Sequence, residues 1–180
     1  MQTKHGHYIT KTFHTMRKVL LTLCLALVGT SAFAQRFDEP EGGDWALGIN
    51  IPMTWGDDVH LGVQPKVQYY ATSRFRLETS FGYYFKAKER IDWDLNLNAH
   101  YLFPMKDTGL WIYPILGIQF LHRHYTVETG DANQARVGLN IGAGFQYDVE
   151  ENLYVNAEVK YTYTNDFDRG NVLVGIGYRF

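Results

Sequence analysis

Apolar side chains occupy every second position along most of the chain after Asp44. A period of two residues is typical of β-strands, whose successive side chains point to opposite faces, and no stretch after Asp44 shows the period of a helix. Eight such stretches follow one another, separated by short polar segments. We therefore predict eight consecutive strands, at residues 45–53, 59–71, 75–85, 91–103, 110–120, 137–149, 153–163 and 172–180.

The two faces of these predicted strands differ in chemistry. The apolar set carries no charge and no glycine, whereas the positions between hold nine charged residues and nine glycines. An eight-stranded barrel is just wide enough inside for side chains to fill it, so it can enclose the small and polar set but not the bulky apolar one. The apolar face must then point outward into an apolar solvent, and tilted strands of about ten residues can cross a bilayer. The sequence therefore predicts an all-β fold, an eight-stranded antiparallel up-and-down transmembrane β-barrel.

Aromatic residues on the apolar face gather near the strand ends. If the chain starts in the periplasm and the strands alternate in direction, one group falls at the periplasmic end and another at the outer end. Two such girdles are typical of outer-membrane barrels. The periplasmic group comprises Trp45, Tyr69, Phe75, Tyr101, Phe103, Tyr147, Tyr178 and Phe180, and the outer group Tyr83, Phe85, Trp93, Phe120, Tyr161 and Tyr163.

The alternation also permits a soluble fold. A soluble periplasmic β-barrel or sandwich that binds a small apolar ligand could bury an alternating apolar face. Pro65 and Pro114 fall inside predicted strands, where each removes a backbone donor. At both prolines we expect a bulge or a shifted strand end.

The first 34 residues form a different kind of segment. From Met16 a basic pair, Arg17 and Lys18, precedes an apolar run at 19–28, and residues 32–34 (AFA) have the form of a cleavage site. The apolar run is too short to span a bilayer. We predict a secretory signal peptide at 1–34, with Met16 as an alternative start, a polar lead-in at 35–43 and the barrel at 44–180.

Charge and cysteine content exclude several classes of protein. The chain carries 17 Lys+Arg against 19 Asp+Glu, which gives no basic excess for nucleic-acid binding. Its single cysteine, Cys24, lies in the predicted signal peptide, which excludes a disulfide scaffold and a multi-cysteine zinc site. We expect no cofactor and no resident metal.

These features together resemble the small eight-stranded outer-membrane barrels of the OmpA/OmpX type, over residues 44–180. The final strand carries the resemblance furthest, because Gly175, Tyr178 and Phe180 match the terminal signal that such barrels present to the barrel-assembly machinery, although Leu173 departs from it. The resemblance implies residence in the outer membrane of a Gram-negative cell envelope, contact with membrane lipid and lipopolysaccharide, and a monomer. A wide, porin-like channel is excluded by the strand number.

The charges on the inward face are the first candidate site. In the hairpin of the third and fourth strands, the expected register places Arg76 opposite His100 and Glu78 opposite Asn98. Because buried charges persist only when paired, we predict an ion-pair network that plugs the lumen, and a gated ion path is the alternative. The predicted members are Lys66, Arg76, Glu78, Asp94, His100, Glu158, Lys160 and Arg179.

An enzyme that acts on envelope lipid is a second functional hypothesis. Related barrels include lipid A deacylases with a serine, a histidine and an acid. Of the two serines after residue 34, Ser73 lies in a turn and Ser80 lies roughly 13 Å along the strand from His100, beyond hydrogen-bond reach. We therefore expect a structural or surface-interaction role without catalysis.

The segment 122–135 is predicted to be the longest outer loop. His122, Arg123 and His124 in it could contact an anionic lipopolysaccharide headgroup or a divalent metal, although a solvated rim is the simpler interpretation. The acidic residues of the other outer loops (Asp57, Asp58, Asp166 and Asp168) lack the spacing of a calcium loop.

Overall fold

The computed structural model describes residues 39–55, 59–87, 90–106, 108–127, 130–165 and 168–180. The chain divides into residues 1–35 and residues 36–180, and everything described belongs to the second unit. The predicted signal peptide lies outside the described residues, as do Asp57, Asp58 and Asp166.

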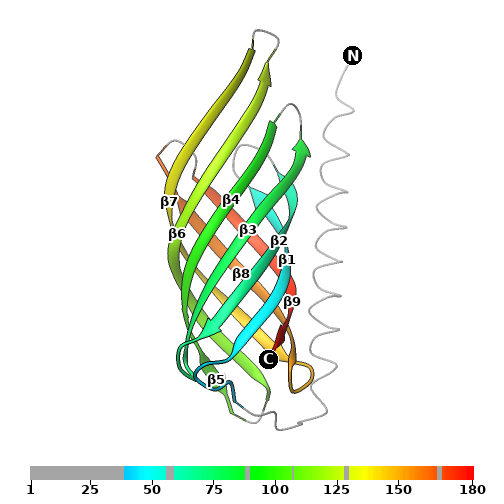
Figure 1. The fold of residues 1–180 in the computed structure, drawn as a ribbon, viewed down its shortest axis with the longest axis vertical. Helices are drawn as coiled ribbons and strands as arrows, with labels where there is room; N and C mark the ends of the chain where they lie inside the picture. The colour runs from blue at the N-terminus through cyan, green and yellow to red at the C-terminus, as the bar shows by residue number, and fades with distance from the viewer. Residues whose placement is uncertain (1–38, 56–58, 88–89, 107, 128–129, 166–167) are drawn as a thin grey trace, which may run out of the picture. The chain divides into compact units, whose positions relative to one another are not determined.

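Antiparallel strands account for almost all of the described chain (Figure 1). Apart from β4 and β5, each strand pairs with the next along the chain. β4 pairs with β6, and β9 pairs with β1, so the sheet closes into a barrel. The strands are β1 (Trp45–Trp55), β2 (His60–Tyr70), β3 (Phe75–Ala87), β4 (Arg90–Tyr101), β5 (Phe103–Met105), β6 (Leu110–Val127), β7 (Gly130–Asp148), β8 (Leu153–Tyr163) and β9 (Arg169–Arg179).

The short strand β5 continues β4, so the barrel has eight strands around its circumference and not nine. His100 of β4 lies opposite Ile115 of β6, and Phe103 of β5 lies opposite Ile112, so both strands keep one register against β6. The break falls at Leu102, whose N–H donates to Arg74 O at 2.7 Å instead of to β6. The predicted architecture, an eight-stranded antiparallel barrel, is confirmed.

No bulge forms at Pro65 or Pro114, but the other expected feature, a shifted strand end, is found opposite Pro114, where β4 ends at Tyr101. Pairing of β2 with β3 lapses at Gln64 and Pro65 and resumes in the same register. Pro114 lies beside the break between β4 and β5. The missing N–H of a proline therefore removes one backbone hydrogen bond between the strands, and the neighbouring residue pairs keep the register. The register shift that β3 and β4 do show lies between Tyr84 and Ala87, near the connection between the two strands.

The predicted division between outward and inward faces is confirmed. Each residue assigned to the apolar face is exposed or half-exposed, for example Leu116 at 67% and Ile141 at 62%. Among the described residues, 27 buried side chains are polar or charged and only ten are apolar. A soluble barrel or sandwich would have the opposite distribution, so that alternative is wrong.

The hairpin of β6 and β7 corrects the predicted loop at 122–135. The two strands stay paired from Leu110 opposite Tyr147 to Val127 opposite Gly130, and they rise beyond the other strands (Figure 1). The sequence does not alternate over 122–135, so the period of two did not mark these residues as strands.

Candidate functional site in the barrel interior

The barrel interior is lined by glycines that alternate with large polar and aromatic side chains. A Cβ on Gly144 would lie 2.6 Å from the Tyr113 ring, and one on Gly48 would lie 2.8 Å from Lys66 Cε. The glycines therefore provide the space that the large residues of neighbouring strands fill, as in other small barrels.

Glu78 of β3 links its two neighbouring strands, β2 and β4, inside the lumen. It accepts hydrogen bonds from Gln68 Nε2 at 2.7 Å and Asn98 Nδ2 at 3.3 Å, and its Oε2 lies 3.9 Å from Lys66 Nζ. Lys66 in turn donates to Asn156 Oδ1 at 2.9 Å, on β8. The register that the sequence predicted here, with Glu78 opposite Asn98, is confirmed.

Arg76 is held by neutral groups. Its guanidinium donates to Gln146 Oε1 at 2.7 Å, to Tyr70 Oη at 3.1 Å and to His100 Nδ1 at 3.2 Å. The Arg76 Cζ atom also lies 4.8 Å from the centroid of the Tyr113 ring, within cation–π distance. The predicted pairing of Arg76 with His100 is confirmed.

Glu158 and Lys160 extend the network from β8. Glu158 accepts from Tyr113 Oη at 2.8 Å and from Asn156 Nδ2 at 3.3 Å. Lys160 Nζ donates to Asn96 Oδ1 at 3.3 Å. Both charges are buried and reach their partners across the lumen, since Tyr113 and Asn96 lie on β6 and β4.

Asp94 lies nearer the β6–β7 end of the barrel and is joined to Lys160 through Asn96, whose Nδ2 donates to Asp94 Oδ1 at 2.6 Å. It accepts from Tyr84 Oη at 2.8 Å and Gln119 Nε2 at 3.1 Å, and it pairs with Arg169. The sequence-based reasoning missed Arg169 because it started the last strand at 172. The alternation, continued back three positions, would have placed Arg169 on the inward face.

Arg179, another predicted member of the network, lies near one end of the barrel. Its Nε lies 3.9 Å from Asp44 Oδ2, and its Nη2 donates to the backbone oxygen of Glu151 at 2.8 Å. Both partners lie at the end of the barrel that carries the described termini.

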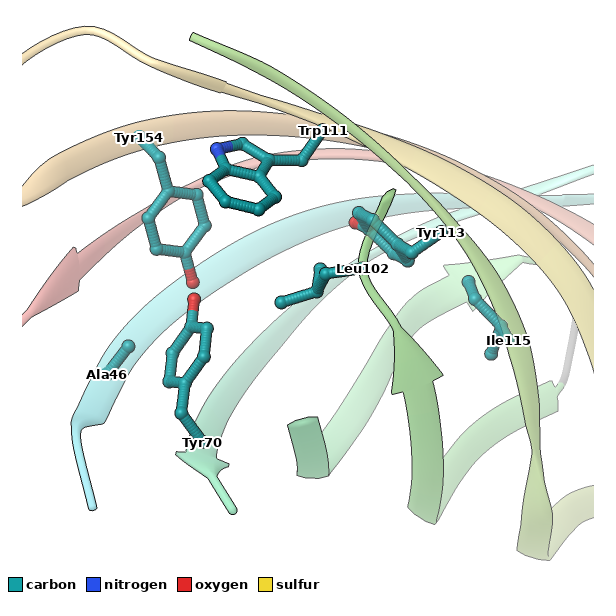
Figure 2. Packing of buried hydrophobic residues seen from close by; sticks show 7 residues of the cluster. All are labelled: Ala46, Tyr70, Leu102, Trp111, Tyr113, Ile115 and Tyr154. Carbon is teal, nitrogen blue, oxygen red and sulfur yellow. The ribbon is translucent and has the colours of Figure 1, made fainter. Parts of the chain in front are cut away.

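An aromatic cluster at that same end was not predicted (Figure 2). Figure 2 shows the hydroxyl ends of Tyr70 and Tyr154 pointing toward one another, with Trp111 beside Tyr154. Asp148 accepts a hydrogen bond from Trp111 Nε1 at 2.7 Å. The signal was present in the sequence, since these residues occupy inward positions of their strands. We call this cluster the aromatic floor; it comprises Ala46, Tyr70, Leu102, Trp111, Tyr113, Ile115 and Tyr154.

The predicted group His122, Arg123 and His124 is divided between the two faces of β6. His122 lies opposite Trp93 on the outward face, and His124 lies two positions further along that face. Arg123 points inward, where its Nε lies 3.5 Å from Asp92 Oδ2. Within the described ranges no three His, Cys, Asp or Glu side chains are grouped as a metal site would require.

The serine considered for catalysis is not joined to the histidine. Ser80 lies opposite Asn96, as predicted, and its Oγ has no hydrogen-bond partner among the described residues. His100 Nδ1 is engaged by Arg76 and its ring stacks on Tyr113 at 4.9 Å.

The residues of the predicted assembly signal lie on the strand that closes the barrel. Tyr178 and Phe180 point outward and are 51% and 63% exposed, and Gly175 faces Asn50 on the inside. The backbone of Phe180 exchanges two hydrogen bonds with Trp45, at 2.8 and 3.1 Å.

A closed barrel with an apolar exterior and a polar interior defines an integral outer-membrane protein. The family model described as outer membrane protein beta-barrel domain matches residues 20–180. The chain therefore belongs to that family, and it is located in the outer membrane. None of the described residues forms a helix that is long and apolar enough to cross a membrane.

Similar proteins share this location or this fold. The 25 kDa outer-membrane immunogenic protein of Brucella ovis is 27% identical over 141 residues, which cover 76% of this chain and 64% of that protein. This chain thus spans less than two thirds of the length of that relative. The N-terminal barrel of Pseudomonas aeruginosa OprF is 22% identical, with a TM-score of 0.63 over 75% of this chain and 97% of that one. Ail, the attachment invasion locus protein of Yersinia pestis, is 20% identical, with a TM-score of 0.60 over 78% and 100%.

Proposed function

We propose that the protein is a non-enzymatic outer-membrane barrel with a plugged, non-conducting lumen that acts as a membrane anchor for a surface-exposed hairpin. The observation that supports this most directly is a set of hydrogen bonds that cross the lumen. Lys66 of β2 reaches Asn156 of β8, and Arg76 of β3 reaches Gln146 of β7. Side chains tied together across the barrel leave ions no wide polar path, and the aromatic floor closes one end.

Conductance measurements test the plug. Purified barrel inserted into a planar lipid bilayer should give no discrete current steps in concentrated potassium chloride, whereas a wide porin inserted in the same way gives them. Steps whose frequency rises with the amount of wild-type protein would overturn the proposal and favour the gated ion path.

The absence of catalysis is part of the proposal. It is supported by the separation of Ser80 from His100 and by the engagement of His100 with Arg76 and Tyr113. We also propose that the barrel is a monomer surrounded by lipid and that Gly175, Tyr178 and Phe180 are read by the assembly machinery. Release of fatty acid from envelope lipid by the purified wild type, lost in His100→Ala, would instead support the enzyme hypothesis.

The orientation follows from the unequal ends of the barrel. Short turns, at 71–74 and 149–152, connect strands at the end that carries the described termini. The long β6–β7 hairpin rises from the other end (Figure 1). Outer-membrane barrels have short periplasmic turns and longer extracellular connections. We therefore assign the hairpin end to the cell exterior.

A surface-interaction role is favoured by the outer part of this hairpin, where β7 extends beyond its ladder with β8. β7 pairs with β6 as far as Gly130, but its pairing with β8 begins only at Leu139. Among the described residues, the strand ladder thus pairs 130–135 with β6 alone. An unpaired strand edge can accept an extended segment of another protein by adding a strand. The name of Ail, attachment invasion locus protein, agrees with such a role.

A shortened hairpin tests this role. Replacement of residues 124–133 by Asn-Gly keeps Arg123 opposite Gln134, provides a tight turn and removes most of this edge. Cells that display this variant at the wild-type level should adhere several-fold less to cultured epithelial cells. Equal adhesion at equal surface amounts would exclude the hairpin as the contact.

A further inference from the structure

The segment before β1 turns back at the end of the barrel that carries the aromatic floor. In this turn, Asp44 N–H donates to Glu41 O at 3.4 Å, and Glu41 N–H donates to Asp44 Oδ2 at 2.9 Å. Gly43 permits the turn, because its φ of 107° lies in a region that residues with a side chain rarely adopt. The Gly43 N–H donates to Tyr70 O at 2.7 Å, which fixes the turn to β2. We call residues 39–44 the strap.

Arg74 joins the strap to the aromatic floor. From the turn between β2 and β3, its Nη2 lies 3.2 Å from Glu39 Oε2 and 3.4 Å from Glu39 Oε1, so both carboxylate oxygens are engaged. The same guanidinium lies over the Trp111 ring, with Cζ 5.4 Å from the ring centroid, within cation–π distance. A single side chain thus contacts the segment before β1 and a floor residue on β6.

The strap packs against the barrel although it precedes the first strand. Pro40 is buried, whereas Glu39 and Glu41 on either side of it are exposed. A buried residue between two exposed carboxylates indicates a segment with one face on the protein and the other in water. Proline also has few backbone conformations to lose, which lowers the entropic cost of ordering the strap.

We propose that the strap is a reversible latch over the aromatic floor, held shut by the ion pair of Glu39 with Arg74. Release of Glu39 lets the strap swing away at Gly42 and Gly43, which change conformation without the restraint of a side chain, and opens the floor to water. The side chains of Arg74 and Glu39 are 33% and 54% exposed, so their pairing is weak enough to open. The inference rests on the proposed plugged lumen, to which it adds a closure that can be released.

Salt distinguishes the latch from the floor beneath it. Exposed charges are screened within a few ångström at about 1 M salt, so concentrated salt should weaken the pair of Glu39 with Arg74. The floor is held by buried contacts, such as the hydrogen bond from Trp111 Nε1 to Asp148 at 2.7 Å, which salt screens much less. Salt should therefore open the strap and leave the floor in place.

Cysteine labelling tests the latch. The full chain has one cysteine, Cys24, so a parent variant with Cys24→Ser and Ala46→Cys carries a single thiol, on a fully buried floor residue. Its rate of reaction with a small neutral maleimide is measured on the folded barrel in detergent. Adding Glu39→Gln should raise this rate about two- to fivefold in dilute buffer, the range that loss of an exposed ion pair supports. Concentrated potassium chloride should raise the rate of the parent to that of Glu39→Gln, and leave Glu39→Gln unchanged.

Glu150→Gln is the matched control, because it removes an exposed carboxylate from the turn at 149–152, at the same end of the barrel. It should leave the labelling rate of the parent unchanged. Arg74→Gln should raise the rate at least as much as Glu39→Gln, and the two together no more than Arg74→Gln alone, because both break one contact. Equal rates for the parent and Glu39→Gln, or an equal rise with Glu150→Gln, would overturn the latch. Either result leaves the proposed plug standing if the wild type still inserts into bilayers without conducting.

Discussion

Charged side chains inside the barrel are held mainly by neutral hydrogen-bond partners. Arg76 donates to a tyrosine, an amide and an imidazole, and Glu158 accepts from Tyr113 and Asn156. Directional bonds to amides and hydroxyls satisfy a buried charge without bringing in a second charge that must also be desolvated. The residues with the largest stabilising effect should therefore be those that satisfy several groups at once.

Glu78 is such a residue, since it accepts from Gln68 and Asn98 and faces Lys66. Glu78→Ala should lower the free energy of unfolding by about 3–5 kcal/mol, because it leaves the buried Lys66 without its counter-charge. Urea unfolding of the barrel in lipid vesicles measures this. Thr79→Ala, the outward neighbour, should change it by no more than about 0.5 kcal/mol.

Replacing Lys66 and Glu78 together distinguishes the loss of the ion pair from the loss of side-chain packing. Lys66→Met/Glu78→Met should regain much of the lost stability, because no charge is then left uncompensated. If Glu78→Ala alone unfolds at the same urea concentration as the wild type, the network does not stabilise the barrel.

Gly144 tests the alternation of small and large residues in the lumen. A Cβ there would lie 2.6 Å from the Tyr113 ring and 2.8 Å from Glu158 Cγ. Gly144→Ala should destabilise the barrel by about 1–3 kcal/mol through overpacking. Heat-induced loss of the folded gel mobility reports the midpoint. Ala143→Val, which faces lipid, is the control, and an unchanged midpoint for Gly144→Ala would show that Tyr113 can move aside.

At the scale of elements, β9 completes the barrel by pairing with β1 through its whole length. Phe180 contributes its backbone to that closure, whereas its side chain points outward. The backbone of Phe180 therefore helps to close the barrel, whereas its side chain belongs to the proposed assembly signal. A substitution of the side chain can separate the two roles.

Phe180→Ala should reduce the amount of barrel in the outer membrane several-fold in cells. Its folded stability should change by less than about 1 kcal/mol, because the backbone bonds to Trp45 remain. Quantified outer-membrane fractions and refolding in pure lipid provide the two readouts, with Val174→Ala as the control on the same strand. Slower refolding in pure lipid would mean that Phe180 acts through intrinsic folding and not through assembly.

The sequence predicted those elements whose two faces meet different solvents. Where one face meets lipid and the other the lumen, the alternation assigned each side chain correctly, and the short β3–β4 connection gave the pairing of Arg76 with His100. Residues 122–135 lack that alternation in the sequence, so they were predicted to be a loop. The aromatic floor was missed because its members come from strands far apart in sequence, and only the closed barrel brings them together.

At the scale of the whole molecule, apolar side chains lie outside and polar side chains inside, the reverse of a water-soluble protein. The cost of placing a charge on the exterior therefore reports whether that position is in contact with lipid or with water. Leu97 lies mid-strand on the outward face and is 49% exposed. Leu153 lies on the same exterior at the start of β8. In water, an arginine at either position would cost almost nothing, since its charge would remain hydrated. In a bilayer, Leu97→Arg should cost about 2–4 kcal/mol and Leu153→Arg only about 0–1 kcal/mol, because the penalty depends on depth. Unfolding in vesicles of defined lipid therefore locates the barrel in the membrane: a larger cost for Leu97→Arg fits a buried mid-section, and equal costs would contradict it.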